Sequence, residues 1–216
     1  MTRLILKMAL AAGSLMLAAA PALAGVPADA VNGDMSLGSP KARIQVLEYA
    51  SAACPHCAHV NAEVIPAFKK TYIDTGRVRF TLKEFLTDPA EVAAGGFLLA
   101  RCGGKAKYFA ILDDVFRSQV KWRAGNIGQV FTEVGTANGL TPEQVNSCLT
   151  DPAALAALNT RVETSATQDK IESTPTFVVN GKRVAGYSLE DLAAAIAAAS
   201  KRVPAAVKHR PKVKRP

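Results

Sequence analysis

The sequence predicts an α/β fold in which a helical insertion separates the second and third strands of the core sheet. Two β-type runs, residues 44–49 and 77–85, flank a helix that begins at Cys54-Pro55-His56-Cys57. A helical pattern then continues for roughly eighty residues, and sheet character returns only at Thr176-Phe177-Val178-Val179. The predicted order is therefore β-α-β, a helical block, and then β-β-α.

Residues 1–24 have the features of a cleaved secretory signal peptide. Arg3 and Lys7 form a basic start, an apolar run follows, and Ala22-Leu23-Ala24 is a small-x-small cleavage site. An uncleaved anchor is the alternative, but the run is shorter than the ~20 apolar residues of a membrane span. We expect export to the periplasm, a compartment in which disulfides persist.

The net charge of +8 comes from the two ends of the chain. Residues 25–200 hold 17 basic and 18 acidic side chains, so this part gives no charge-based case for nucleic acid. Residues 201–216 hold seven basic and no acidic side chains. We expect this tail to be disordered, either as a solubilising end or as a segment attracted to anionic lipid headgroups or an acidic partner.

The predicted domain covers residues 41–200, preceded by a short polar leader (25–40) with one edge strand. The run 44–49 is largely apolar, as a buried central strand should be. The helix from Cys54 extends to about residue 72, and Pro66 should kink it.

Turn and capping residues divide the rest of the chain. In the helical block, about residues 88–170, Asp88-Pro89-Ala90-Glu91 predicts an N-cap followed by a first-turn proline. Thr141-Pro142-Glu143-Gln144 predicts a second capped start, and Asp151-Pro152 opens a longer helix. Asn180-Gly181 is the residue pair of a type I′ hairpin turn. A final helix over 189–199 is capped by Ser188 with Asp191.

Two cysteines two residues apart at a helix start form a candidate dithiol–disulfide centre. Cys54 would face the unpaired N–H groups of the first turn and the positive end of the helix dipole, which stabilise a thiolate. A stabilised thiolate favours the reduced form and makes the disulfide oxidising. Pro55 suits the first helical position, and a protonated His56 would add positive charge.

Other uses of Cys54 and Cys57 fit less well. Haem attachment needs a histidine directly after the second cysteine, where Ala58 stands. A structural zinc needs four ligands, and only His56 and His59 lie nearby. A purely structural disulfide remains as an alternative, although so small a loop adds little stability. We therefore predict redox catalysis with no metal and no cofactor.

Ser173-Thr174-Pro175-Thr176-Phe177 stands just before the third strand. Combined with C-x-x-C after a first strand, this segment resembles the thioredoxin fold, whose cis-proline loop lies against the active-site disulfide. The Cys-Pro-His-Cys motif, the helical insertion and the export signal narrow the resemblance to DsbA-type thiol:disulfide oxidoreductases of an alphaproteobacterial-like group. The resemblance extends to Ala100-Arg101-Cys102.

The resemblance implies roles for individual residues. Cys54 would be the nucleophile and Cys57 the resolving thiol, while Pro175 would be cis and Thr174 would pair with substrate backbone. The partners would be unfolded or folding exported proteins and a membrane quinone-linked reoxidase of the DsbB type, and we expect a monomer. Thr174 is shared with disulfide isomerases, whereas the enteric oxidase has valine there.

Two further pairs of residues are candidates. Glu48 lies on the central strand, and we expect it to pair with Lys83 beneath the active site as a proton route; the alternative is that both side chains face outward. Cys102 and Cys148 should form a second, structural disulfide because an exported protein rarely leaves two thiols free. Closing its loop of about 46 residues would contribute roughly 4 kcal/mol.

The predicted function is an exported oxidase that donates disulfides to folding proteins. A reductase or isomerase kept reduced by a membrane donor would use the same residues with the opposite electron flow. A disulfide-stapled peptide-binding module is the non-enzymatic alternative. The leader is too short to be a dimerisation module, which disfavours the isomerase.

Overall fold

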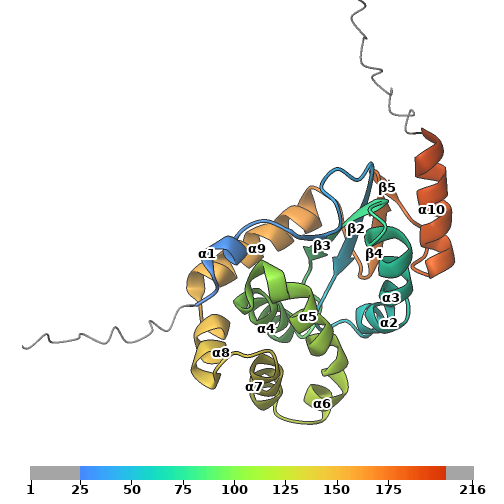
Figure 1. Cartoon of the computed structure of the whole chain (residues 1–216). Coiled ribbons are helices and arrows are strands. Elements are labelled where there is room, and N and C mark those ends of the chain that lie inside the picture. The colour runs from blue at the N-terminus through green and yellow to red at the C-terminus, as the bar shows by residue number, and fades with distance from the viewer. Residues whose placement is uncertain (1–24, 203–216) are drawn as a thin grey trace, which may run out of the picture.

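The computed structural model describes residues 25–202 and places a five-stranded sheet between helices (Figure 1). The predicted signal peptide and residues 203–216 of the predicted tail lie outside the described residues. The elements occur in this order: α1 (Ala28–Val31), β1 (Met35–Leu37), β2 (Ile44–Ala50), α2 (Pro55–Glu63), α3 (Ile65–Phe68), the π-helix η1 (Lys69–Ile73), β3 (Val78–Glu84), α4 (Ala90–Cys102), α5 (Gly104–Arg117), α6 (Gln119–Ala124), α7 (Ile127–Ala137), α8 (Pro142–Leu149), α9 (Pro152–Thr167), β4 (Thr176–Val179), β5 (Lys182–Arg183) and α10 (Leu189–Arg202).

The strands lie in the order β1-β3-β2-β4-β5, with β2 in the centre of the sheet. β2 and β3 are parallel, and the other neighbouring pairs are antiparallel. A parallel pair needs a crossover, which α2, α3 and η1 supply here. The carboxyl end of the central strand therefore leads directly into the turn before α2.

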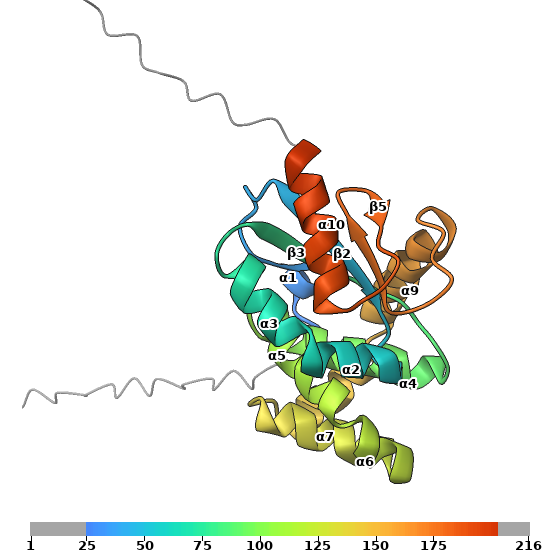
Figure 2. The same ribbon diagram turned by 90° about the vertical axis from the view of Figure 1, so that its right-hand side faces the viewer.

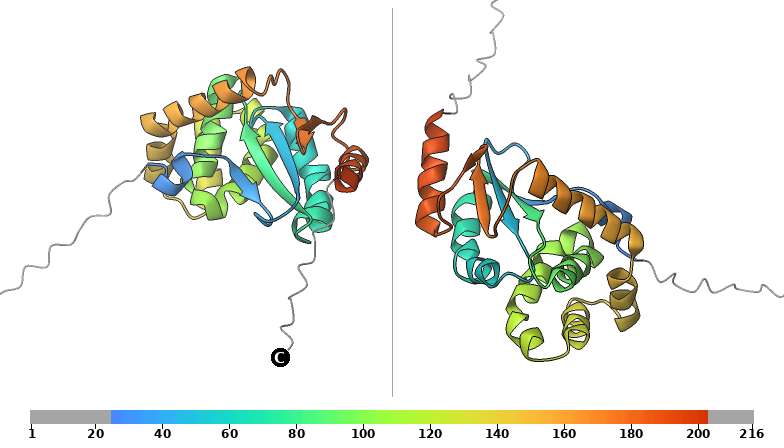
Figure 3. Two further views of the ribbon diagram at one scale, coloured as in Figure 1. Left: turned by 90° about the horizontal axis from the view of Figure 1, so that it is seen from above. Right: turned by 180° about the vertical axis from the view of Figure 1, so that it is seen from behind.

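Helices cover both faces of the sheet. Figure 3 shows the sheet between α10 on one side and α9 on the other, and Figure 2 shows α2 and α3 beside α10. Helices α4 to α9 separate β3 from β4 in the chain, so the predicted fold class with its helical insertion is confirmed. None of the helices in the described part of the chain is both long and apolar enough to cross a bilayer.

Most of the predicted turns and caps are present. The Thr141 hydroxyl accepts the Gln144 N–H while the Gln144 side chain accepts the Thr141 N–H, which completes the capping box of α8. Asp151 caps α9 through two backbone N–H groups. Asn180 and Gly181 have φ of 45° and 78°, the left-handed conformation that a type I′ turn requires.

The ends of three helices differ from the prediction. Pro89, not Asp88, is the N-cap of α4, and no side chain caps that helix. The predicted long helix is interrupted at Val64 because Pro66 has no N–H to donate to the carbonyl four residues earlier, and its ring crowds that carbonyl. Lys201 and Arg202, which were assigned to the tail, form the last turn of α10. The short helix α1 was not predicted.

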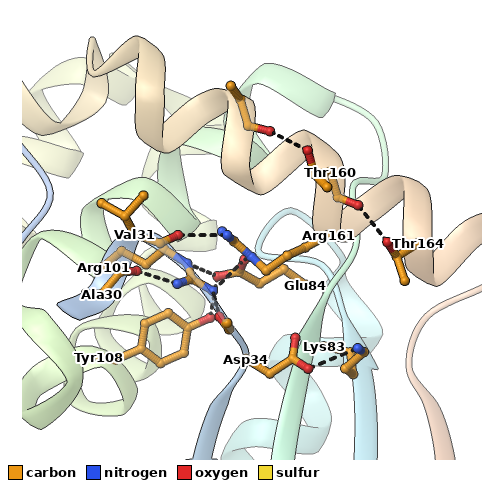
Figure 4. Close-up of polar contacts among 12 residues, drawn as sticks. Ala30, Val31, Asp34, Lys83, Glu84, Arg101, Tyr108, Thr160, Arg161 and Thr164 are labelled. Carbon is orange, nitrogen blue, oxygen red and sulfur yellow. Dashed lines mark hydrogen bonds and ion pairs between the residues drawn. The ribbon is translucent and has the colours of Figure 1, made fainter. Parts of the chain in front are cut away.

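A buried network around Glu84 joins the helical insertion to the end of β3 (Figure 4). The carboxylate accepts hydrogen bonds from Arg101 (2.7 and 2.9 Å), Arg161 (2.8 Å) and the Tyr108 hydroxyl (2.9 Å). The two arginines also donate to backbone carbonyls of residues 30–33 in the leader. A buried carboxylate is tolerated only when paired in this way, so the network fixes α4, α5, α9 and the leader against β3.

Cys102 and Cys148 form a disulfide that joins the end of α4 to α8. Their Cα atoms lie 5.8 Å apart, and 46 positions separate them in the chain. The bond closes a loop wholly within the helical insertion. Cys54 and Cys57 are both free thiols in this structure.

Candidate active site

The turn after β2 positions Cys54 at the N-cap of α2, and Pro55 is the first residue of that helix. The Cys54 sulfur accepts the backbone N–H of Cys57 at 3.4 Å. Cys54 retains 6 % exposure, whereas Cys57 is fully buried. Of the two cysteines, only Cys54 is exposed to solvent at all, so it is the one that we expect a substrate to reach.

The surroundings of Cys54 favour its thiolate. The side chain of Cys57 is the main cause: its thiol donates a hydrogen bond to the Cys54 sulfur. Burial opposes ionisation, while Thr174 and the backbone N–H groups of Cys57 and His56 support it. Together these groups lower the pKa of Cys54 from 9.0 to about 5, so the thiolate predominates at neutral pH.

The surroundings of Cys57, unlike those of Cys54, disfavour its thiolate. Burial, followed by the interaction with Cys54, raises the pKa of its thiol. The raised pKa keeps Cys57 protonated over the physiological range. The pair therefore consists of one accessible thiolate and one buried thiol, the asymmetry that directional thiol–disulfide exchange requires.

Thr174 and Pro175 form a wall beside the Cys54 sulfur. The peptide bond between them is cis, and in the thiol form Cys54 donates to the Thr174 carbonyl at 3.4 Å. The Thr174 hydroxyl is buried and has no hydrogen-bond partner that meets the usual geometry among residues 25–202. It nevertheless lies close enough to the sulfur to favour the thiolate.

His56 differs from its neighbours in its exposure. The residue is exposed on the first turn of α2, and its backbone N–H supports the Cys54 thiolate. The imidazole makes no hydrogen bond or ion pair to the other described residues of this site.

Glu48 is a buried carboxyl group on β2, with 4 % exposure. Burial, and to a lesser degree the negative charge of Cys54, raises its pKa to about 8. Glu48 in turn contributes to the raised pKa of the Cys57 thiol, so the two groups interact. Its side chain lines a cavity of about 340 Å³ whose walls include Ile65 and Phe80.

The predicted pairing of Glu48 with Lys83 is wrong. Glu48 lies opposite Leu82 in the register of β2 and β3, and Lys83 lies opposite Tyr49. Successive side chains of a strand point to opposite faces, so Glu48 and Lys83 lie on different faces of the sheet. Lys83 pairs instead with Asp34 at 3.0 Å, as Figure 4 shows.

Two residues that the sequence did not predict contact the active-site turn. Gln119 and Arg123 on α6 hydrogen-bond to backbone carbonyls of this turn. They lie more than sixty positions from Cys54 and belong to no motif, so the sequence carried no signal for them. Within residues 25–202, no three His, Cys, Asp or Glu side chains gather as a metal site would need.

A family model described as thioredoxin matches residues 30–198. The chain belongs to the thioredoxin family. Within this family it is similar to a Rickettsia bellii protein whose name provisionally describes it as a protein-disulfide oxidoreductase, with 36 % identity over 167 residues. That match covers 76 % of this chain and 63 % of the relative, so the chain spans less than two thirds of the relative's length.

Solved structures of Dsb proteins share this thioredoxin-family fold. Wolbachia pipientis alpha-DsbA1 superposes with a TM-score of 0.72 at 25 % identity, over 78 % of this chain and 92 % of that one. Bacillus subtilis BdbD, solved in its oxidised state, gives a TM-score of 0.69 at 19 % identity, over 82 % and 97 % of the two chains, and supports the fold alone. The DsbA-type resemblance predicted from the motifs is confirmed.

Proposed function

We propose that this chain is an exported thiol:disulfide oxidase that introduces disulfides into folding proteins. The observation that carries the proposal is the asymmetry of its two thiols. The pKa of accessible Cys54 is lowered to about 5, while that of buried Cys57 is raised. Stabilising the Cys54 thiolate stabilises the reduced enzyme, and this makes the Cys54–Cys57 disulfide a strong oxidant.

In the proposed reaction, a substrate thiolate attacks the Cys54 sulfur of the enzyme disulfide. A bond forms between substrate and Cys54 while the Cys54–Cys57 bond breaks, and Cys57 leaves as a thiolate that takes up a proton. A second substrate thiolate then attacks the substrate sulfur of the mixed disulfide, and Cys54 leaves as its stable thiolate. Two electrons pass from the substrate dithiol to the enzyme.

Glu48 is the proposed source of the proton for Cys57. Its pKa of about 8 keeps the carboxyl group mostly protonated at neutral pH. The raised pKa of Cys57 makes the leaving thiolate the stronger base, so the proton moves from Glu48 to sulfur. The cavity beside Glu48 offers space for water to return the proton.

The wall formed by Thr174 and Pro175 is the proposed substrate contact. The Thr174 carbonyl lies within 3.4 Å of the Cys54 sulfur, so an extended peptide pairing with the Thr174 backbone would bring its own cysteine to that sulfur. Reoxidation would use a membrane quinone-linked partner of the DsbB type, in keeping with the signal peptide predicted for residues 1–24.

A reductase or isomerase is the second candidate, and Thr174 is the observation that favours it. Its buried hydroxyl stands where the enteric oxidase has valine, and disulfide isomerases share this threonine.

Equilibrating the protein with glutathione buffers tests the proposal. A reduction potential near about −120 mV, the value of DsbA itself, supports the oxidase, and one near about −270 mV, that of thioredoxin, overturns it. Cys54→Ser should abolish oxidation of a reduced substrate protein. If this variant retains the biological role of the parent, the protein is a peptide-binding module.

A further inference from the structure

Helix α6 contacts three consecutive carbonyls of the active-site turn. The Gln119 amide donates to the carbonyl oxygens of Ala52 (2.9 Å) and Cys54 (3.1 Å). The Arg123 guanidinium donates to the carbonyl of Ala53 between them (3.1 Å). Two side chains from one short helix of the insertion thus bind the backbone on which the redox centre is built.

The geometry of α6 accounts for this arrangement. Gln119 and Arg123 are four residues apart, so both project from the same face of the helix. Trp122 lies between them in the sequence and packs in a small apolar cluster with Ala53. The Arg123 guanidinium lies 5.0 Å from the centre of the Trp122 ring, which restrains the arginine near the turn.

The two side chains differ in their surroundings. Gln119 is 5 % exposed, and its buried amide directs both donated hydrogen bonds to the turn. A hydrogen bond made in a buried environment orients its partners strongly, because the alternative is an unpaired polar group. Arg123 is exposed, so solvent screens its charge and its influence should be weaker.

The turn is held from its other side as well. The Ser51 hydroxyl accepts hydrogen bonds from the N–H (3.1 Å) and the hydroxyl (2.9 Å) of Thr87, which lies between β3 and α4. The turn between β2 and α2 is therefore held at Ser51 by Thr87 and at residues 52–54 by α6. Both sets of hydrogen bonds hold the backbone just before the first turn of α2, where the Cys54 sulfur accepts the N–H of Cys57.

We infer that Gln119 and Arg123 are positioning residues of the redox centre, through which the helical insertion holds the Cys54 sulfur at the N-terminus of α2. The inference rests on the proposed function and extends it to residues outside the Cys-Pro-His-Cys motif. Without these bonds, the carbonyls of Ala52 and Ala53 would lose their donors, while that of Cys54 would keep the N–H of Ala58. The turn would then be held less tightly, and the sulfur would spend less time against the N–H groups that stabilise its thiolate.

Two substitutions test the inference in the full-length protein. Gln119→Met removes both donors at similar length, and Arg123→Met removes the third. The matched controls are Gln129→Met and Arg117→Met. They alter an exposed glutamine and an exposed arginine of the same insertion, whose side chains bond to acidic side chains and not to the turn. The readouts are the pH titration of the Cys54 thiolate and the equilibrium constant with glutathione.

Gln119→Met should raise the pKa of Cys54 and shift the glutathione equilibrium roughly threefold towards the enzyme disulfide, a change of about 14 mV. Arg123→Met should act in the same direction with a smaller effect, and both controls should match the wild type. A folded Gln119→Met protein with the wild-type titration and equilibrium constant would show that Gln119 is merely structural. An equal change in Arg117→Met would assign the Arg123 effect to net charge and overturn its positioning role.

If Gln119→Met does not fold, the comparison of Arg123→Met with Arg117→Met decides the question, because both arginines are exposed. The potential of the wild-type protein reports separately on the proposed oxidase. A wild-type value near that of thioredoxin would refute the oxidase, while the shifts between variants would still test the positioning.

Discussion

Replacing Cys57 with alanine should raise the pKa of Cys54 from about 5 to about 6–7. The Cys57 side chain is the largest cause of the lowered pKa, and alanine removes that donor. A hydrogen bond to a charged group is worth about 1.5–3 kcal/mol. Since about 1.36 kcal/mol corresponds to one pH unit, the midpoint should rise by about one to two pH units.

The ultraviolet absorbance of the thiolate, recorded against pH, measures this midpoint. Cys102 and Cys148 are bonded to each other, so Cys54 is the one free thiol left in the alanine variant. Cys57→Ser is the matched control, because its hydroxyl still donates and should give a midpoint closer to the wild type. A midpoint that stays near 5 in the alanine variant would refute the reasoning and assign the stabilisation to the backbone N–H groups of α2.

Three further predictions follow from the same structure. Arg101→Met should lower the free energy of unfolding by about 3–5 kcal/mol because Glu84 loses its closest partner. The exposed control, Arg117→Met, should change that free energy by less than about 0.5 kcal/mol. Urea unfolding measures both, and a loss under about 1 kcal/mol for Arg101→Met would contradict the stabilising role of the network. Reduction of the Cys54–Cys57 disulfide takes up two protons below the pKa of Cys54 and one above it. The reduction potential should therefore fall by about 59 mV per pH unit at low pH and by about 30 mV per pH unit above a break near pH 5. A single slope throughout would exclude a thiolate at Cys54. Glu48→Gln should slow oxidation of a substrate dithiol by roughly a hundredfold or more in stopped-flow measurements, and an unchanged rate would remove Glu48 from the proton route.

Local signals in the sequence predicted most of the fold. The Asn180-Gly181 turn and the Thr141 capping box depend on neighbouring residues alone, and both form as expected. The start of α4 was misassigned because Asp88 and Pro89 have the composition of a capped helix without its geometry. Helix α1 is only four residues long, and its position depends on contacts with distant helices that no local pattern reveals.

The residues of the candidate site differ in the same way, because some positions follow from local sequence and others depend on contacts between distant residues. The position of Cys54 at a helix start follows from the spacing of the motif, whereas the partner of Glu48 depends on the register of two strands. A shift of one residue in that register turns a side chain to the other face, and this is why Lys83 was misassigned. Gln119 could not be found from sequence because its role consists of bonds to backbone that is distant in the chain.

The network at Glu84 restricts deletions in the leader more than it restricts substitutions. Arg101 and Arg161 hold the leader by backbone carbonyls of residues 30–33, and every amino acid offers such a carbonyl. Substitutions at exposed Asn32 should therefore be tolerated, whereas Ala30 is fully buried in the core and Gly33 has a φ of 78° that favours glycine. Deleting the segment would instead take three carbonyl acceptors away from the two guanidinium groups. At exposed positions such as Asn32, the length of the leader is therefore more constrained than its sequence.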